Sequence, residues 1–172
     1  MSTAHATITF HRADPDREST ILAALRIHGF RFEYIDAVTS PLRLFRAYGM
    51  RDADSLICDQ LGTLVRKLDR SAVFTICQDP NNEFVGQLLV SDPDLGDFHC
   101  HADEEGTPLV PATEVCRAAE TAHHAITAGV RAPAAFRQLY RLTGSPWWQR
   151  IDELRAGSAE TTTKTTADGS AA

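Results

Sequence analysis

Residues 8–62 constrain the fold most strongly, because strand-like and helix-like patterns follow one another along this segment. The run ITFHR at residues 8–12 is rich in β-branched and aromatic side chains, which is typical of a strand. Residues 20–29 repeat apolar side chains at helical spacing, and residues 30–38 alternate between apolar and polar side chains. The order strand, helix, strand predicts a βαβ unit in the first part of the chain.

The predicted helix at residues 20–29 has signals at both ends. Asp14 or Asp16 can accept hydrogen bonds from the free N–H groups of the first turn. Gly29 suits the left-handed conformation that ends many helices. The stripe expected to be buried consists of Ile21, Leu22, Leu25 and Ile27.

From residue 71 the sequence pattern changes to short apolar runs that are separated by strong turn signals. Residues 72–78, 84–90 and 97–102 have the composition of strands. The links DPNN and DPDLG between them are short and are made of residues that favour turns. Three consecutive strands with short links predict an antiparallel meander, and the acidic run DEEG at residues 103–106 predicts a loop after it.

Helical patterns follow the meander at residues 112–128 and 134–142. A third helix is expected to begin at Ser145, which is followed by a proline. From residue 157 onward the chain has almost no apolar side chain to bury, which predicts disorder. The apolar stripes are Val115, Ala119, Ala122 and Ile126 in the first of these helices, and Trp147, Ile151 and Leu154 in the third.

A helix that ends in glycine and enters an alternating strand occupies residues 23–36, and Pro41 and Tyr48-Gly49 follow it. In these features residues 6–75 resemble the glutaredoxins and the N-terminal domain of glutathione transferases. The residues from Pro41 to Gly49 are expected to form a short helix. Residues 55–64 resemble the strand–turn–strand hairpin of that family.

The expected fold is therefore of the mixed α+β class. A thioredoxin-like or glutaredoxin-like βαβ half is expected over residues 1–70. An antiparallel β-meander followed by helices is expected over residues 71–155, packed with the first half as one unit. Residues 156–172 are expected to form a disordered tail.

The reactive groups of the resembled family are missing from this chain. The position of its Cys-x-x-Cys motif reads PDRE at residues 15–18, and the position of its cis-proline reads DADS at residues 52–55. Without a thiolate at the helix start, disulfide exchange by the family mechanism is excluded. Glutathione transferases use a hydroxyl or thiol at this helix start, so the resemblance makes Ser19 a candidate catalytic residue. Glu18, Ser19 and Asp54 are candidate binding residues; the alternative is that Ser19 is an ordinary polar residue of the first turn.

A cluster of histidines and cysteines is the other candidate site. In a strand, His99 and His101 point to the same face, and Cys100 points to the other. Cys116 and His123 share a face of the following helix. If the strand and the helix pack together, the two histidines, Cys116 and His123 form a tetrahedral zinc site. The alternative is a solvated strand face, with the cysteines as small buried side chains.

Composition limits the classes of partner. The net charge of −6 argues against binding to nucleic acid, which requires a basic surface. No apolar segment approaches the ~20 residues of a membrane span, and the N-terminal run lacks a signal-peptide pattern. The four cysteines lie singly, which is typical of reduced thiols in a cytoplasmic protein.

Trp148, close to several arginines, is a candidate partner-binding residue. The sequence therefore predicts a non-catalytic binding or regulatory protein on a redox-inactive, glutaredoxin-like scaffold. Its expected partner is a protein, and no cofactor is expected. The alternative function is an enzyme, either zinc-dependent or similar to glutathione transferases.

Overall fold

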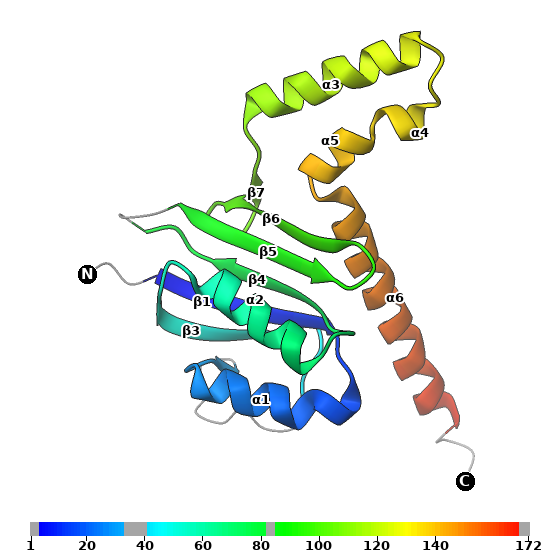
Figure 1. Cartoon of the computed structure of the whole chain (residues 1–172). Helices are drawn as coiled ribbons and strands as arrows, with labels where there is room; N and C mark the ends of the chain where they lie inside the picture. The colour runs from blue at the N-terminus through cyan, green and yellow to red at the C-terminus, as the bar shows by residue number, and fades with distance from the viewer. Residues whose placement is uncertain (1–3, 33–40, 82–84, 169–172) are drawn as a thin grey trace.

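The computed structural model describes residues 4–32, 41–81 and 85–168 of the chain. Its described strands form one sheet in the order β2-β3-β1-β4-β5-β6-β7, and each neighbouring pair is antiparallel (Figure 1). The expected mixed α+β class is confirmed. The strands are β1 (Ala4–Arg12), β2 (Arg31–Phe32), β3 (Ala47–Ala53), β4 (Val73–Gln78), β5 (Gly86–Asp92), β6 (Gly96–Ala102) and β7 (Pro108–Leu109).

Two helices, α1 (Glu18–Ile27) and α2 (Ile57–Leu68), cover one face of the sheet (Figure 1). With the first four strands they give the chain order β-α-β-β-α-β. Strands β1 and β2 run parallel but are separated by β3, which is the split βαβ arrangement of ferredoxin-like folds. The glutaredoxin-like arrangement is not confirmed, because β1 pairs with β3 and β4 and is antiparallel to both.

Two local predictions in this half are wrong. Residues 55–64, expected to form a hairpin, belong mostly to α2, whose buried side chains recur at helical spacing. The residues from Pro41 to Gly49 form no helix; β3 begins at Ala47, because its backbone pairs with β1. Of the strand predicted at residues 30–38, only β2 is described, and residues 33–40 lie outside the described part of the chain.

The predictions for α1 are confirmed apart from one residue. The carboxylate of Asp14 accepts a hydrogen bond from the N–H of Asp16 at 3.0 Å, at the start of a 3-10 turn that precedes α1. Gly29 has a φ of 81° and ends the helix. Ile27 is 83 % exposed, because it lies about 200° around the helix from the buried Leu25. The buried residues of α1 are Ile21, Leu22 and Leu25.

Each face of the sheet carries a hydrophobic core. The larger core lies between the sheet and the two helices α1 and α2. On the opposite face, β5 and β6 pack against α6 (Ser145–Asp168). The predicted meander is confirmed as β4, β5 and β6, and alternation along β5 directs Leu89 to the first core and Leu88 to the second. The second core consists of Leu88, Val90, Phe98, Ala102, Trp147 and Ile151.

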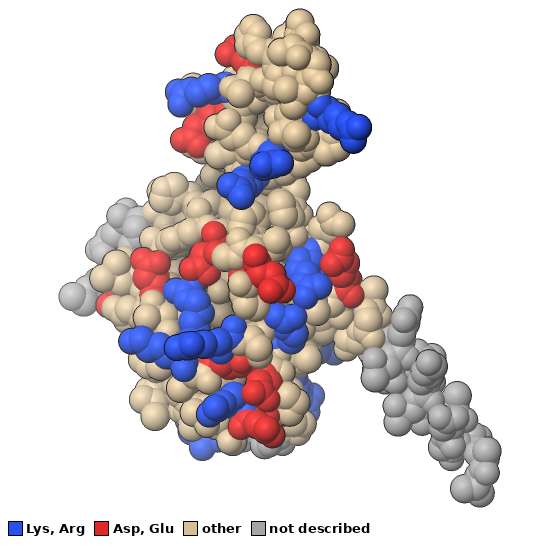
Figure 2. Space-filling view, turned by 45° about the vertical axis from the view of Figure 1, so that its right-hand side comes forward, with Lys and Arg blue, Asp and Glu red and all other residues tan. Residues whose placement is uncertain are grey.

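After β7 the chain forms α3 (Ala112–Thr127), α4 (Ala132–Ala135) and α5 (Arg137–Leu142), and α6 then returns across the sheet. The first three of these helices pack together and stand away from the sheet as a lobe, here called the helical arm (Figures 1 and 2). The helices predicted after the meander are thus present. The backbone of α6 is helical as far as Asp168, within the segment for which disorder is predicted.

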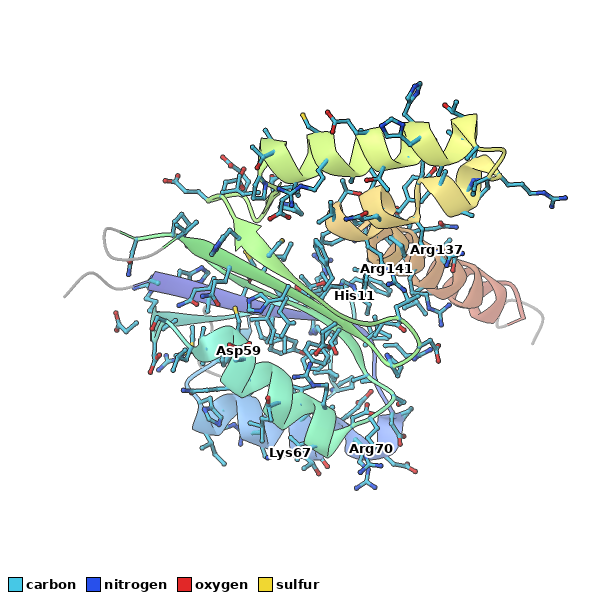
Figure 3. All side chains as sticks on the ribbon, turned by 45° about the horizontal axis from the view of Figure 1, so that its top comes forward. His11, Asp59, Lys67, Arg70, Arg137 and Arg141 are labelled. Atoms are coloured by element: carbon cyan, nitrogen blue, oxygen red, sulfur yellow. The ribbon has the colours of Figure 1, made fainter. Side chains whose placement is uncertain are left out.

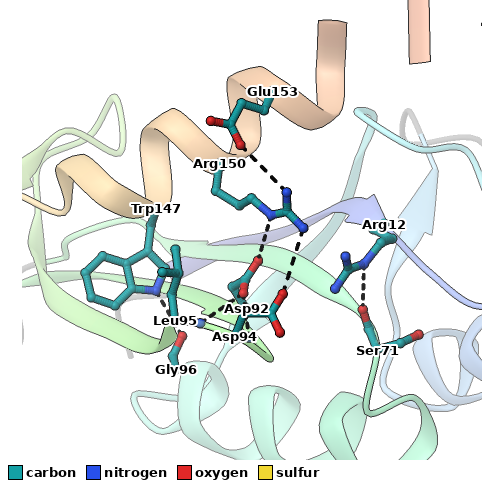
Figure 4. Close-up of polar contacts among 9 residues, drawn as sticks. All are labelled: Arg12, Ser71, Asp92, Asp94, Leu95, Gly96, Trp147, Arg150 and Glu153. Carbon is teal, nitrogen blue, oxygen red and sulfur yellow. Dashed lines mark hydrogen bonds and ion pairs between the residues drawn. The ribbon is translucent and has the colours of Figure 1, made fainter. Parts of the chain in front are cut away.

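Helix α6 is fastened to the turn between β5 and β6 (Figure 4). The indole Nε1 of Trp147 donates a hydrogen bond to the carbonyl oxygen of Gly96 at 2.9 Å. Arg150 forms an ion pair with Asp92. Of the expected apolar stripe, Trp147 and Ile151 are buried, and Leu154 is half-buried. No helix among the described residues has the length and apolar character needed to cross a membrane.

Candidate functional site: a groove along β6

A groove of about 730 Å³ lies along β6, between the outer strand of the meander and the helical arm. Residues of β6 from Asp97 to His101 form its floor. The linker that follows Leu109 forms one wall, and α5 together with the indole of Trp147 forms another. Arg141 lies on the side of α5 that is turned toward the sheet (Figure 3). Elements of both the sheet and the helical arm therefore line this space.

Part of β6 has no neighbouring strand on the groove side among the residues described. Strand β7 pairs only with His101 and Ala102. The N–H of Asp103 donates a hydrogen bond across the turn that leads to β7, so the backbone polar groups of this residue face β7. Because these groups alternate along a strand, those of His101 also face β7, and those of His99 and Asp97 face the groove. This stretch of backbone is open to pairing with another strand.

The two faces of β6 differ in their chemistry. His99 and His101 lie on the same face, as predicted, and both are exposed. On this face Asp97 forms an ion pair with Arg66 of α2, and Nδ1 of His99 lies 3.8 Å from a carboxylate oxygen of Asp59. The side of the groove formed by Asp97, His99 and His101 is therefore polar.

The other side of the groove is apolar. The rings of Phe98 and Trp147 pack with their centroids 5.4 Å apart. Leu142 of α5 and Leu109 of β7 also line the groove, and Leu109 is 45 % exposed. The exposed Leu109, next to this largely buried aromatic pair, offers apolar surface to a ligand.

Cys100 also lines the groove, and partial burial changes the pKa of its thiol. Burial, with a smaller effect of Cys77, raises the pKa of the Cys100 thiol to about 11. Burial also raises the pKa of Cys77 to about 11 and that of Cys58 to about 12. The thiolate is the nucleophilic form of cysteine. At neutral pH these three thiols are therefore protonated and react slowly as nucleophiles.

The predicted zinc ligands do not meet. His99 and His101 line the groove, but the residue that α3 contributes to it is Glu114. Cys116 and His123 are exposed, about 130° around α3 from the side that packs on α5. Within the described ranges, no group of three or more His, Cys, Asp or Glu side chains is arranged to hold a metal ion.

The residues of the predicted N-terminal site also lie far apart. Ser19 is exposed in the first turn of α1, and a carboxylate oxygen of Glu18 accepts a hydrogen bond from the N–H of Leu42 at 3.3 Å. Asp54 follows β3, whose end pairs with the start of β1, whereas α1 follows the other end of β1. The length of β1 therefore separates Ser19 from Asp54, roughly 26 Å at the usual rise of a strand. These residues do not form one binding site.

Trp148, the predicted partner-binding residue, is half-buried and packs against the second core, whereas Trp147 lines the groove. The free edge of β6 is hard to find in the sequence, although one signal points to it. Pro108 is the first residue of β7 and Pro111 lies two residues after its end, and proline interrupts a hydrogen-bonded ladder. The two prolines restrict β7 to a short strand that cannot cover the whole of β6.

Comparisons with known proteins give no family assignment. No protein-family model matches the chain, and no curated protein or solved structure shows a significant match to it. The function proposed below therefore rests on the geometry of the groove.

Proposed function

We propose that this chain is a non-catalytic binding protein that takes up an extended peptide segment as an additional strand beside β6. The observation that carries the proposal is the free backbone edge at Asp97 and His99, which lies inside a groove. Strand addition uses such N–H and C=O groups for affinity and pockets for alternate side chains for specificity. The groove volume of about 730 Å³ is in the range of ligand sites.

The two sides of the groove define which peptide fits it. Successive side chains of an added strand would point alternately toward the Phe98–Trp147 side and toward the His99–His101 side. The ligand is therefore a segment with apolar residues at every second position and polar residues between them. The uncovered edge, from Gly96 to Cys100, matches a segment of about five residues, or roughly 17 Å.

Surface charge and thiol chemistry support a peptide-binding role. On the face shown in Figure 2, acidic and basic side chains are interspersed over the body of the protein rather than gathered into a basic stripe. Residues 15–18 contain no cysteine, and the thiols of Cys58, Cys77 and Cys100 are protonated at neutral pH. The scaffold in this proposal is therefore redox-inactive.

The experiment selects random displayed peptides against the full chain and measures the affinity of the enriched peptides for two variants at one position. His99→Pro removes the N–H that faces the groove, and a proline is tolerated on a strand edge. It is expected to weaken binding at least about tenfold, through the lost hydrogen bond. His99→Ala keeps this N–H and removes the imidazole, so its affinity should stay within about threefold of that of the unmodified chain.

Circular dichroism and the unfolding temperature show whether both variants keep the fold. Amide hydrogen exchange supplies a second measurement, because the bound peptide should slow exchange at Asp97 and His99. Equal affinity for His99→Pro and the unmodified chain would contradict strand addition. A selection that enriches no alternating sequence would also end the proposal.

A further inference from the structure

The wall that α5 contributes to the groove carries a cation without a counter-charge. Arg141 lines the groove together with Gln138 and Leu142, which lie on the same side of α5. The Arg141 side chain is exposed, and within the described part of the chain it forms no ion pair and no hydrogen bond. Glu114 also lines the groove but does not form an ion pair with Arg141. The guanidinium is therefore available to a ligand.

The segment that contains Arg141 is poor in negative charge, although the whole chain is acidic. The chain has 23 acidic and 17 basic residues, yet residues 121–151 contain four arginines and no acidic residue. Arg150 is paired with Asp92, whereas Arg137 and Arg141 form no ion pair with any described residue. Figure 2 shows basic side chains at the end of the helical arm that adjoins the body. This end of the arm therefore attracts an acidic group toward the groove.

We infer that the segment bound beside β6 carries an aspartate or glutamate side chain that pairs with Arg141. This inference rests on the proposed strand addition and specifies the charge of its ligand. Alternate side chains of an added strand point to the side of the groove that holds Phe98 and Trp147, and α5 forms a wall with Trp147. One of these positions is therefore acidic, and the others remain apolar.

The chemistry of the groove favours a carboxylate over a phosphate. A guanidinium presents its N–H donors in a planar fork that can bind both oxygens of a carboxylate. Asp97 and Glu114 line the same groove, and a doubly charged phosphate would be repelled by both. A single guanidinium and a singly charged carboxylate neutralise each other, and arginine is enriched in interfaces of this kind.

The test uses the peptides that the displayed selection enriches, synthesised with acetylated and amidated ends. Their affinity is measured for the full chain and for two variants of α5. Arg141→Gln removes the guanidinium from the groove and should weaken binding about fivefold or more. Arg137→Gln makes the same change one turn earlier, at a residue that does not line the groove, and should change affinity less than about twofold. Circular dichroism checks that both variants keep their helices.

A double-mutant cycle tests whether the two charged groups meet. Replacing the acidic residue of the peptide with its amide should weaken binding to the unmodified chain, and should have little further effect on binding to Arg141→Gln. Arg141→Glu should reverse the preference, so that a peptide with lysine at this position binds the variant more tightly than the acidic peptide does. Additive losses in the cycle, or equal losses in Arg137→Gln and Arg141→Gln, would overturn the inference.

The outcomes distinguish this inference from the proposed function. If the peptides lose affinity in His99→Pro and keep it in Arg141→Gln, strand addition stands and the acidic contact is wrong. Binding that requires a free C-terminus, and is lost on amidation, would also overturn the inference, because the carboxylate would then belong to the end of the peptide. If the selection enriches no peptide, both proposals fail together.

Discussion

Nε of Arg150, on α6, lies 3.5 Å from the buried carboxylate of Asp92 at the end of β5 (Figure 4). The Asp92 side chain is 1 % exposed, and its Oδ1 accepts hydrogen bonds from the N–H groups of Asp94 and Leu95 at 2.7 and 3.1 Å. Its Oδ2 has no hydrogen bond within the described structure and is the atom nearest Arg150. The guanidinium of Arg150 therefore compensates the buried negative charge of Asp92, at the β5–β6 turn that α6 contacts.

Replacing Arg150 with methionine should lower the free energy of unfolding by about 2–3 kcal/mol, because it leaves the Asp92 carboxylate buried without a counter-charge. Urea denaturation measures this change. Glu153 is an exposed partner of the same arginine, so Glu153→Ala should change stability by less than about 0.5 kcal/mol. In an Asp92→Asn background, Arg150→Met should cost less than about 1 kcal/mol. An equal loss in both backgrounds would show that the charge of Asp92 is not the cause.

Buried His11 should make stability depend on pH. It is 6 % exposed, and its Nε2 lies 2.8 Å from the hydroxyl of Thr75. Burial, together with the charge of Arg155, lowers the pKa of His11 from 6.5 to about 4. Below pH 6.5 the unfolded chain binds a proton that the folded chain binds only near pH 4, so the free energy of unfolding falls as the pH drops through this window. The expected contribution is roughly 3 kcal/mol.

The measurement compares the unmodified chain with His11→Gln by urea denaturation at several pH values between 6.5 and 4. Glutamine does not titrate, so the difference between the two proteins isolates the contribution of His11. The unmodified chain should lose more stability on acidification than the variant does. Parallel pH profiles for the two proteins would mean that His11 binds its proton equally well in the folded and unfolded states.

At neutral pH, one of the four thiols should react rapidly with a thiol reagent, and the other three should react slowly. Cys116 is exposed, whereas burial raises the pKa values of Cys58, Cys77 and Cys100 to about 12, 11 and 11. Their thiolate fractions are small, so these three should react at least about 100-fold more slowly than Cys116. Cys116→Ser should remove the fast phase, and denaturant should make the remaining thiols react together. More than one fast thiol in the folded protein would contradict this assignment.

Two glycines with the same backbone conformation should differ in their tolerance of alanine. Gly144 and Gly129 have φ values of 69° and 85°. A Cβ at Gly144 would lie 2.6 Å from the ring of Phe98, whereas a Cβ at Gly129 would meet no atom within 4 Å. Gly129→Ala should cost about 1 kcal/mol from backbone strain alone, and Gly144→Ala at least about 2 kcal/mol. Thermal unfolding of both variants gives the comparison, and equal losses would mean that Phe98 gives way without cost.

The parts of the fold that follow local patterns are predictable from the sequence. In α1 and in the meander, side-chain periodicity and turn residues agree with one another, and both are confirmed. Helix α2 is difficult to predict from the sequence because it contains Gly62, and a glycine within a short apolar run indicates a turn. A Cβ at Gly62 would lie 2.5 Å from Leu89, so the glycine serves close packing of α2 on β5. Strand β3 depends on pairing with the distant β1, and no local pattern encodes that pairing.

The candidate site could be predicted only in part, for the same reason. The shared face of His99 and His101 follows from strand alternation alone. The groove beside them depends on where β7 stops and on where the arm returns to the sheet. Arg141 and Trp147 reach it from helices that lie far from β6 in the sequence. Local periodicity carries no information about such distant contacts.

Helix α6 behaves as a rod that joins two distant parts of the sheet. Trp147 forms part of the groove wall, and Arg155, about 12 Å further along the helix, lies over the ring of Phe45, which packs against His11. Rotation of the rod about its own axis would therefore move the indole and the guanidinium together. Such a rotation would then change the width of the groove and the burial of His11 at the same time.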